Sequence, residues 1–120
     1  MAPDRSGGLV DYRILGSLEV ASNGVAAELG PQKQQAVLAA LLLHANEIVP
    51  ADRLIELVWG EHAPRTAAHS IQIYVSALRK ALEPIAGGPV IATRPPGYVL
   101  ETDPDSIDAH RFERWVLRHL

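Results

Sequence analysis

The stretch that decides the fold is TAAHSIQIYVSALRKAL at residues 66–82, followed by VIATRPPGYVL at residues 90–100. In the first segment, apolar side chains recur after four, three and four residues, at Ile71, Val75, Leu78 and Leu82. At about 100° per residue, these side chains share a narrow arc of one helix and are expected in a core. The second segment has two β-rich runs around a proline- and glycine-containing turn, which predicts a hairpin.

The opposite side of the helix predicted from Thr66 to Leu82 is mostly polar. It carries His69, Gln72, Ile73, Ser76 and Lys80. The apolar Ile73 on this side is interpreted as a contact surface or as a chance exposed residue. Residues 65–94 hold four Lys or Arg and one Glu, within a chain of net charge -3. A modest basic face on an acidic body is typical of a protein that meets nucleic acid with one surface.

The preceding residues predict a small antiparallel meander and two further helices. Residues 12–21 alternate as a strand does, an Asn-Gly turn follows, and residues 25–29 return as a second strand. The period then changes to that of a helix over residues 31–45 and again over residues 51–59, after which Gly60 ends the second helix. Residues 61–64 form a short connection to the third helix.

The predicted fold is an α+β winged helix-turn-helix. Its elements follow one another as strands, two helices, a longer helix with a basic outer face, and a hairpin. In such a module the third helix enters the major groove of DNA, and the hairpin wing contacts the minor groove or the backbone. The position of each side chain then predicts its role. Phosphate contacts are predicted for Arg79 and Lys80, base-edge contacts for His69, Gln72, Ile73 and Ser76, and the wing contact for Arg94.

Composition excludes several other classes. The chain of 120 residues is long enough for one domain, and it has no cysteine for a disulfide or a thiolate metal site. Its longest apolar run, residues 36–43, is far shorter than the roughly 20 residues of a membrane span. The five histidines do not have the spacing of metal ligands. Asp103 and Asp105 are interpreted as turn and cap residues. The sequence contains no phosphate-binding loop and no nucleophile elbow. We therefore expect a cytoplasmic protein with no enzymatic activity, no cofactor and no metal.

Three blocks of the sequence resemble the OmpR/PhoB-type winged-helix domain of the Streptomyces antibiotic regulatory protein (SARP) family. They are LIELVWG at residues 54–60, ALRKAL at residues 77–82 and TRPPGYVL at residues 93–100, and the resemblance covers about residues 12–100. The middle block alone is ordinary helix composition. Three blocks in this order and spacing are a specific signal.

The resemblance also predicts the domain organisation. Residues 108–113, DAHRFE, are similar to the opening of the helical bacterial transcriptional activation domain that follows in this family. The last predicted helix ends on an apolar residue and carries Ala109, Phe112, Val116 and Leu120 at helical spacing. We expect a flexible N-terminus at residues 1–11, a winged-helix domain at residues 12–102, and the beginning of a truncated activation domain at residues 103–120.

The resemblance implies a transcription activator that binds promoter direct repeats and recruits RNA polymerase with its sigma factor, acting on secondary-metabolite genes such as antibiotic clusters. It implies DNA contacts by His69, Ser70, Tyr74, Ser76, Ala77 and Arg79 on the helix and by Arg94 on the wing. The loop before the helix is implied to contact polymerase, through Gly60, Glu61, His62, Ala63, Pro64 and Arg65. Ser76 and Ala77 stand where the wider OmpR/PhoB group has basic residues. Modest affinity is therefore expected for one copy, with a second copy side by side about one helical turn away.

The alternative from another class is a winged helix that binds a protein and not DNA. Ile73 and Tyr74 would then form the hydrophobic contact, and binding would respond little to salt. A repressor is a further alternative within the DNA-binding class. Activators and repressors differ by where their site lies in a promoter, which this sequence does not contain.

Overall fold

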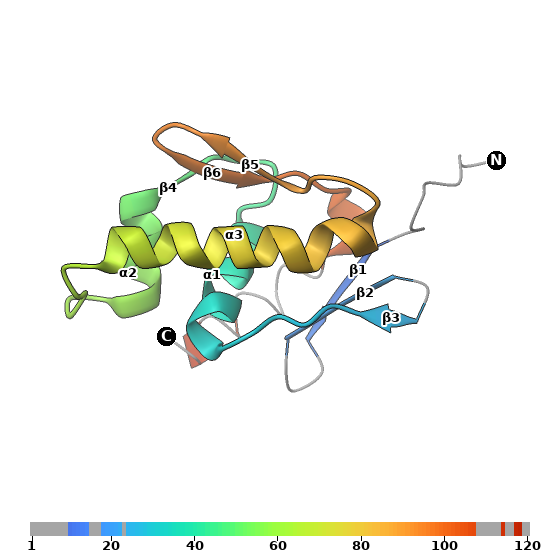
Figure 1. Cartoon of the computed structure of the whole chain (residues 1–120), viewed down its shortest axis with the longest axis horizontal. Helices are drawn as coiled ribbons and strands as arrows, with labels where there is room; N and C mark the ends of the chain where they lie inside the picture. The colour runs from blue at the N-terminus through green and yellow to red at the C-terminus, as the bar shows by residue number, and fades with distance from the viewer. Residues whose placement is uncertain (1–9, 15–17, 23, 108–113, 115–116, 119–120) are drawn as a thin grey trace.

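A computed structural model describes residues 10–14, 18–22, 24–107, 114 and 117–118 of the chain. Figure 1 shows three helices between two small antiparallel sheets, with the longest helix, α3, lying across the front of the view. The N-terminal sheet lies near the end of α3, and the second sheet runs alongside α3. The predicted α+β winged-helix class is confirmed in this arrangement.

The N-terminal sheet contains β1 (Asp11–Ile14), β2 (Leu18–Ser22) and β3 (Val25–Ala26), in the order β1-β2-β3. Tyr12 lies opposite Val20, and both side chains are buried. The prediction that the returning strand continues to residue 29 is wrong, because β3 ends at Ala26 and one further hydrogen bond, from the Ala27 N–H to the Val20 carbonyl, is made beyond it. The chain leaves the sheet so that Leu29 can reach the core, and Gly30, with φ of +80°, turns it toward the first helix.

Helix α1 (Gln32–Leu43) forms the centre of the molecule and packs against both other helices. Residues 36–42 are all buried, which explains why the helix has an apolar run where a surface helix would have a stripe. Asn46, with φ of +67°, ends the turn after α1. Its backbone N–H donates to the Leu100 carbonyl at 2.8 Å, and its side-chain amide exchanges two hydrogen bonds with the Thr102 backbone.

Strand β4 (Val49–Pro50) leads directly into α2 (Ala51–Trp59), whose bounds are those predicted from the sequence. Leu54 and Val58 are buried on its inner face. Gly60 follows with φ of +66°, and its N–H donates to the Glu56 carbonyl at 2.8 Å. A glycine tolerates this conformation without steric cost, so α2 ends here.

Helix α3 (Ala67–Ala86) buries the predicted stripe of Ile71, Val75, Leu78 and Leu82. The predicted end at Leu82 is wrong, since the helix continues for one more turn and contains Pro84. A proline lacks the N–H that would bond to the carbonyl four residues earlier, at Lys80. Lys80 is exposed, so water can hydrogen-bond to that carbonyl, and Gly87 in the left-handed conformation ends the helix instead.

The wing consists of β5 (Ile91–Arg94) and β6 (Gly97–Leu100), and β6 also pairs with β4. The sequence predicts strands at residues 90–93 and 98–101, and each observed strand lies one residue nearer the tip, because Arg94 is the last residue of β5 and pairs with Gly97. The two-residue tip is therefore the cis Pro95-Pro96 pair, and Arg94 lies beside it. At Gly97 any Cβ atom would overlap the Val49 carbonyl oxygen and lie 2.7 Å from the Cα atom of Pro50, so β4 can approach only a glycine.

The helix predicted from Asp105 onward begins differently. Pro104–Ser106 form a short 3-10 helix, and Ile107 is extended and forms a bridge with Tyr12 of β1. The predicted helical positions Ala109, Phe112, Val116 and Leu120 lie outside the described residues.

Candidate nucleic-acid interface

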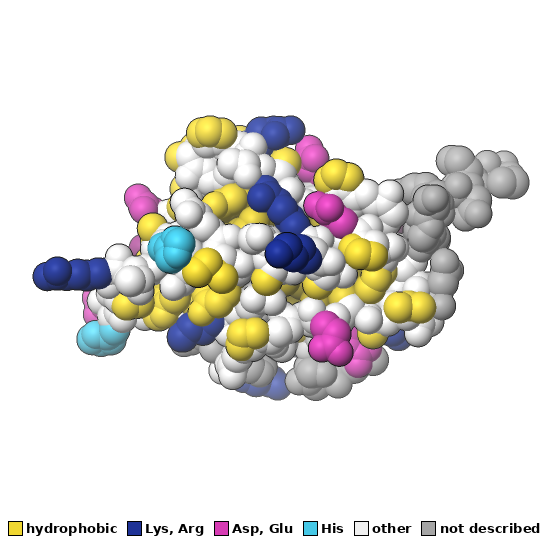
Figure 2. Space-filling view, viewed as in Figure 1, with side chains coloured by type: hydrophobic (Ala, Val, Ile, Leu, Met, Phe, Trp, Pro, Cys, Tyr) yellow, Lys and Arg dark blue, Asp and Glu magenta, His cyan; other side chains and the backbone are white. Residues whose placement is uncertain are grey.

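The outer face of α3 presents a row of side chains to solvent. His69, Gln72, Ile73, Ser76 and Lys80 are exposed, and 52% of Ile73 is accessible. Ser70 and Ala77 are half-buried at the border of this row. In Figure 2, Lys and Arg side chains extend from the α2–α3 connection over α3 to the wing. Asp and Glu side chains in this view lie toward the C-terminal end of α3 and also at the left edge, to the sides of the Lys and Arg side chains that lie over the middle of the helix.

The middle of this row is hollowed. Gln72, Ile73, Ser76, Ala77 and Lys80 line a shallow depression with a volume of about 340 Å³. The small side chains of Ser76 and Ala77 leave this space between the larger Ile73 and Lys80. The hollow offers an apolar contact next to an amide, a hydroxyl and an ammonium group, which are donors and acceptors suited to base edges.

Tyr74 points to one side of the exposed row. It is half-buried and packs against the core, with its ring 6.3 Å from that of Trp59 on α2 at an interplanar angle of 23°. The Lys33 ammonium lies 5.7 Å from the centre of the Trp59 ring. The family resemblance implies a DNA contact for Tyr74, and the structure places its ring in the packing between α2 and α3.

Arg79 points to the other side of the row, toward the wing. Its Nε donates to the Ile91 carbonyl at 3.0 Å, and its Nη2 donates to Oγ1 of Thr93 at 2.7 Å. Its guanidinium also lies 6.0 Å from the centre of the Tyr98 ring. The sequence predicts a phosphate contact for Arg79 and misses these partners, because they lie 12 to 19 residues further along the chain and depend on where the wing packs.

Arg94 remains available at the end of β5. It is exposed, and its Nη1 donates to the neighbouring Thr93 carbonyl at 3.0 Å. Lys80 is also exposed. These two cations therefore lie on the two elements that a winged helix presents to DNA, the third helix and the hairpin.

The α2–α3 connection stands out from the helices. All six of its predicted contact residues are exposed: Gly60, Glu61, His62, Ala63, Pro64 and Arg65. The Pro64 carbonyl accepts a hydrogen bond from the Ala67 N–H at 3.1 Å, so the connection is joined to the first turn of α3. A ligand bound to this loop would lie beside the N-terminal end of the third helix.

The family model described as "Transcriptional regulatory protein, C terminal" matches residues 27–100, which is more than half of the chain. The chain belongs to this family of DNA-binding transcriptional regulators. The predicted resemblance to the OmpR/PhoB-type domain of SARP regulators is thereby confirmed. Transcription regulation and DNA binding are properties of this family.

Relatives and solved structures agree with this membership. The chain is 40% identical over 105 residues to the transcriptional regulatory protein EmbR of Mycobacterium tuberculosis, covering 86% of this chain and 27% of EmbR. It is 32% identical over 112 residues to the regulatory protein DnrI of Streptomyces peucetius, covering 88% of this chain and 41% of DnrI. The chain thus spans less than half the length of these curated relatives.

A solved structure of Mycobacterium tuberculosis EmbR with a phosphopeptide is similar to this regulator domain, with a TM-score of 0.75 and 39% identity over 81% of this chain and 26% of that chain. The DNA-binding domain of Escherichia coli CadC has a TM-score of 0.62 and 25% identity, covering 78% of this chain and 88% of that chain. Both likenesses support the winged-helix fold of this chain.

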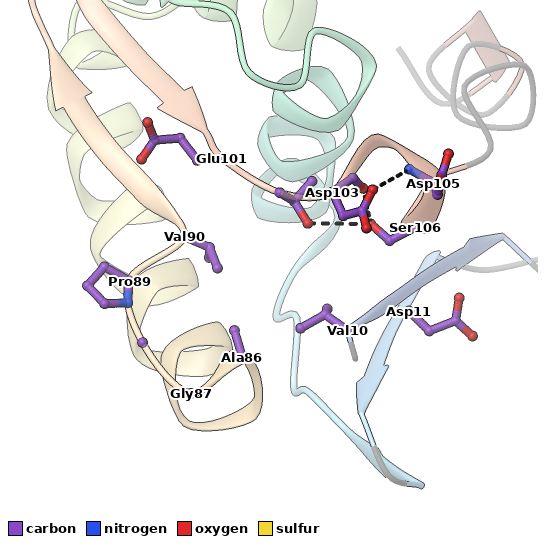
Figure 3. Close-up of a pocket in the computed structure, with 12 residues that line it drawn as sticks. Val10, Asp11, Ala86, Gly87, Pro89, Val90, Glu101, Asp103, Asp105 and Ser106 are labelled. Atoms are coloured by element: carbon purple, nitrogen blue, oxygen red, sulfur yellow. Dashed lines mark hydrogen bonds between the residues drawn. The ribbon is translucent and has the colours of Figure 1, made fainter. Parts of the chain in front are cut away.

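The regulator domain has a second and larger cavity, of about 570 Å³, at the C-terminal end of α3 (Figure 3). Its walls include Asp11, Glu101, Asp103 and Asp105, and none of the described residues that line it is Lys or Arg. Asp103 accepts a hydrogen bond from the Asp105 N–H at 3.0 Å, so it caps the 3-10 helix as the sequence predicts. A concave surface with these carboxylates repels phosphate, which distinguishes it from the exposed row of α3.

Among the residues that the structure describes, no three His, Asp or Glu side chains come together as metal ligands. None of the helices in the described part of the chain combines the length and the apolar character that crossing a membrane requires.

Proposed function

We propose that this domain is the DNA-reading part of a cytoplasmic transcription activator that binds direct repeats in promoters. The observation that carries the proposal is the exposed row of α3, with the wing and Arg94 beside it. The helix supplies polar side chains for the major groove, and the wing supplies a cation for the adjacent minor groove or backbone. This role requires no catalysis by the chain.

Base reading is assigned to the hollow on α3. The Gln72 amide can both donate to and accept from an adenine edge, and Ser76 can bond to either kind of base. Ile73, half-exposed beside the small Ala77, fits the methyl group of a thymine. His69 and Ser70 would contact the DNA near the first turn of α3, and Lys80 would bind a phosphate.

Two copies are proposed to bind side by side. The exposed cations of α3 and the wing are only Lys80 and Arg94, and the electrostatic part of DNA affinity grows with the number of neutralised phosphates. A second copy on the adjacent half-site doubles that number. Half-sites about one helical turn apart would place both copies on the same side of the duplex.

The exposed α2–α3 connection, Gly60 to Arg65, is proposed to contact RNA polymerase through its sigma factor. It is joined to the start of α3 and extends away from the core, so a bound protein could reach it while α3 occupies DNA. The resemblance to the SARP family supports a role in secondary-metabolite genes, including antibiotic clusters.

The test combines DNA selection with transcription in vitro. Genomic fragments bound by the chain would be sequenced, and purified polymerase would then transcribe a promoter that carries the recovered site. We expect direct repeats at helical-turn spacing. Glu61→Ala with Arg65→Ala should keep DNA affinity and reduce transcription by the full-length regulator. Recovery of random fragments would contradict sequence-specific binding, and full transcription by the double variant would remove the connection from the proposal.

A further inference from the structure

We propose that Arg79 is a positioning residue that fastens the wing to α3 and so sets where Arg94 meets DNA. This inference rests on the proposed function. It gives Arg79 a different role from the direct phosphate contact that its place on the recognition helix predicts. Arg79 would act on DNA only through the wing.

The contacts of Arg79 join three elements. Two nitrogens of one guanidinium bond to β5, at the Ile91 carbonyl and the Thr93 hydroxyl, and its plane lies near the Tyr98 ring of β6. Both strands of the wing are therefore held by one side chain of α3. Thr93 directly precedes Arg94, so the 2.7 Å bond to its Oγ1 holds the side chain of the residue next to the proposed DNA contact.

The wing depends on this fastening because of its place in the sheet. Strand β6 is held on its other side by β4, whereas β5 is an edge strand with β6 as its single partner strand. In the part of the chain that the structure describes, no other side-chain hydrogen bond joins α3 to the wing. Without Arg79, β5 would be held by its pairing with β6 and by the burial of Ile91 at its start, whereas Thr93 and Arg94 near the tip are exposed.

Arginine and lysine distinguish the two roles of this residue. A lysine retains the positive charge and can still bind a phosphate, but its single nitrogen cannot reproduce a two-nitrogen fork. A direct phosphate contact therefore survives Arg79→Lys, and a fastening does not. Thr93→Val supplies a matched variant that removes one acceptor of the fork and leaves every charge in place.

The first measurement needs no DNA. Amide hydrogen exchange in the free protein should become faster over residues 91–100 in Arg79→Lys and Arg79→Gln, while α1 keeps its protection. Thr93→Val should give a smaller change in the same residues. Unchanged wing exchange in Arg79→Lys overturns the inference whatever the protein binds. A loss of protection throughout α1 overturns it too, because Arg79 would then support the whole fold.

The second measurement uses a duplex with the selected repeat. Arg79→Lys, Arg79→Gln and Arg94→Ala should each weaken binding about tenfold, and Arg94→Ala should add little in the Arg79→Lys background. In DNA footprinting with the Arg79 variants, the protection of the minor groove by the wing should vanish. The protection of guanine N7 in the major groove by α3 should stay. Wild-type affinity in Arg79→Lys, or additive effects, overturns the positioning role and leaves the proposed function standing. Failure of the wild-type protein to bind any duplex overturns the proposed function itself.

Discussion

The response of DNA binding to salt is the sharpest consequence of the charge distribution on α3 and the wing. Cations that neutralise DNA phosphates release counterions, so affinity falls as salt rises, in proportion to the number of contacts. Lys80 and Arg94 are exposed on the proposed face, whereas Arg79 is engaged with the wing. We therefore take two phosphate contacts per copy.

The size of the salt effect follows from the number of phosphate contacts. Two contacts predict a slope of log affinity against log salt of about −1.8 for one copy and about −3.6 for two copies on a repeat. Between about 50 and 200 mM salt, the pair should bind about 150-fold more weakly. Lys80→Gln removes one contact from each copy, so the slope of the pair should fall to about −1.8, and the same change of salt should cost about 12-fold.

The assay is fluorescence anisotropy with a labelled duplex over a range of salt concentrations. Arg13→Gln is the matched control, because it removes the same charge from β1, where Arg13 lies 3.0 Å from Asp11 and away from α3. Its slope should equal that of the wild-type protein. A flat slope for the wild-type protein would refute phosphate binding and favour the protein-interaction module. If the salt slope fell equally in Lys80→Gln and Arg13→Gln, net charge, and not the face of α3, would control binding.

Three further predictions concern stability and base reading. Gly97→Ala should lower the free energy of unfolding by about 1–3 kcal/mol, because its Cβ would push β4 from β6. Gly88→Ala, with open space at its Cβ, should leave the free energy of unfolding unchanged. Urea titration measures this free energy for both variants. Burial raises the pKa of Tyr12 above 10.0 in the folded protein, although the Thr102 side chain opposes the shift. The unfolded chain therefore loses this proton first, so unfolding should become easier as pH rises above 10.0, and Tyr12→Phe should abolish that contribution in urea titrations between about pH 9 and 11. Replacing the thymine at Ile73 by deoxyuridine should weaken binding about fourfold, the value of one buried methyl, and Ile73→Ala should be insensitive to this replacement in the anisotropy assay.

Elements with strong local signals were predictable from the sequence. The bounds of α2 are marked by Pro50 before it, by Leu54 and Val58 one turn apart, and by Gly60 after it. The end of α3 carried two competing signals, because Pro84 favours a break and Gly87 favours an end three residues later. Lys80, whose carbonyl Pro84 leaves without a donor, is exposed, so the helix continues to Ala86 and ends at Gly87. The position of a helix end therefore depended on solvation, which the local sequence does not report.

The residues of the candidate site also fall into a predictable and an unpredictable group, and the angle of each residue around α3 decides which. The arc opposite the buried stripe holds Ser76, His69, Lys80 and Ile73, with Gln72 at its edge about 90° from the stripe, and all five are exposed. Tyr74 and Arg79 lie about 70° from the stripe on opposite flanks. Side chains at such angles meet whatever element packs beside the helix, which is α2 with Trp59 for Tyr74 and the wing for Arg79. Periodicity within one element identifies its outward face. A flanking residue can only be assigned once the neighbouring elements are placed, and this is why Arg79 reads as a DNA contact in the sequence and as a support of the wing in the structure.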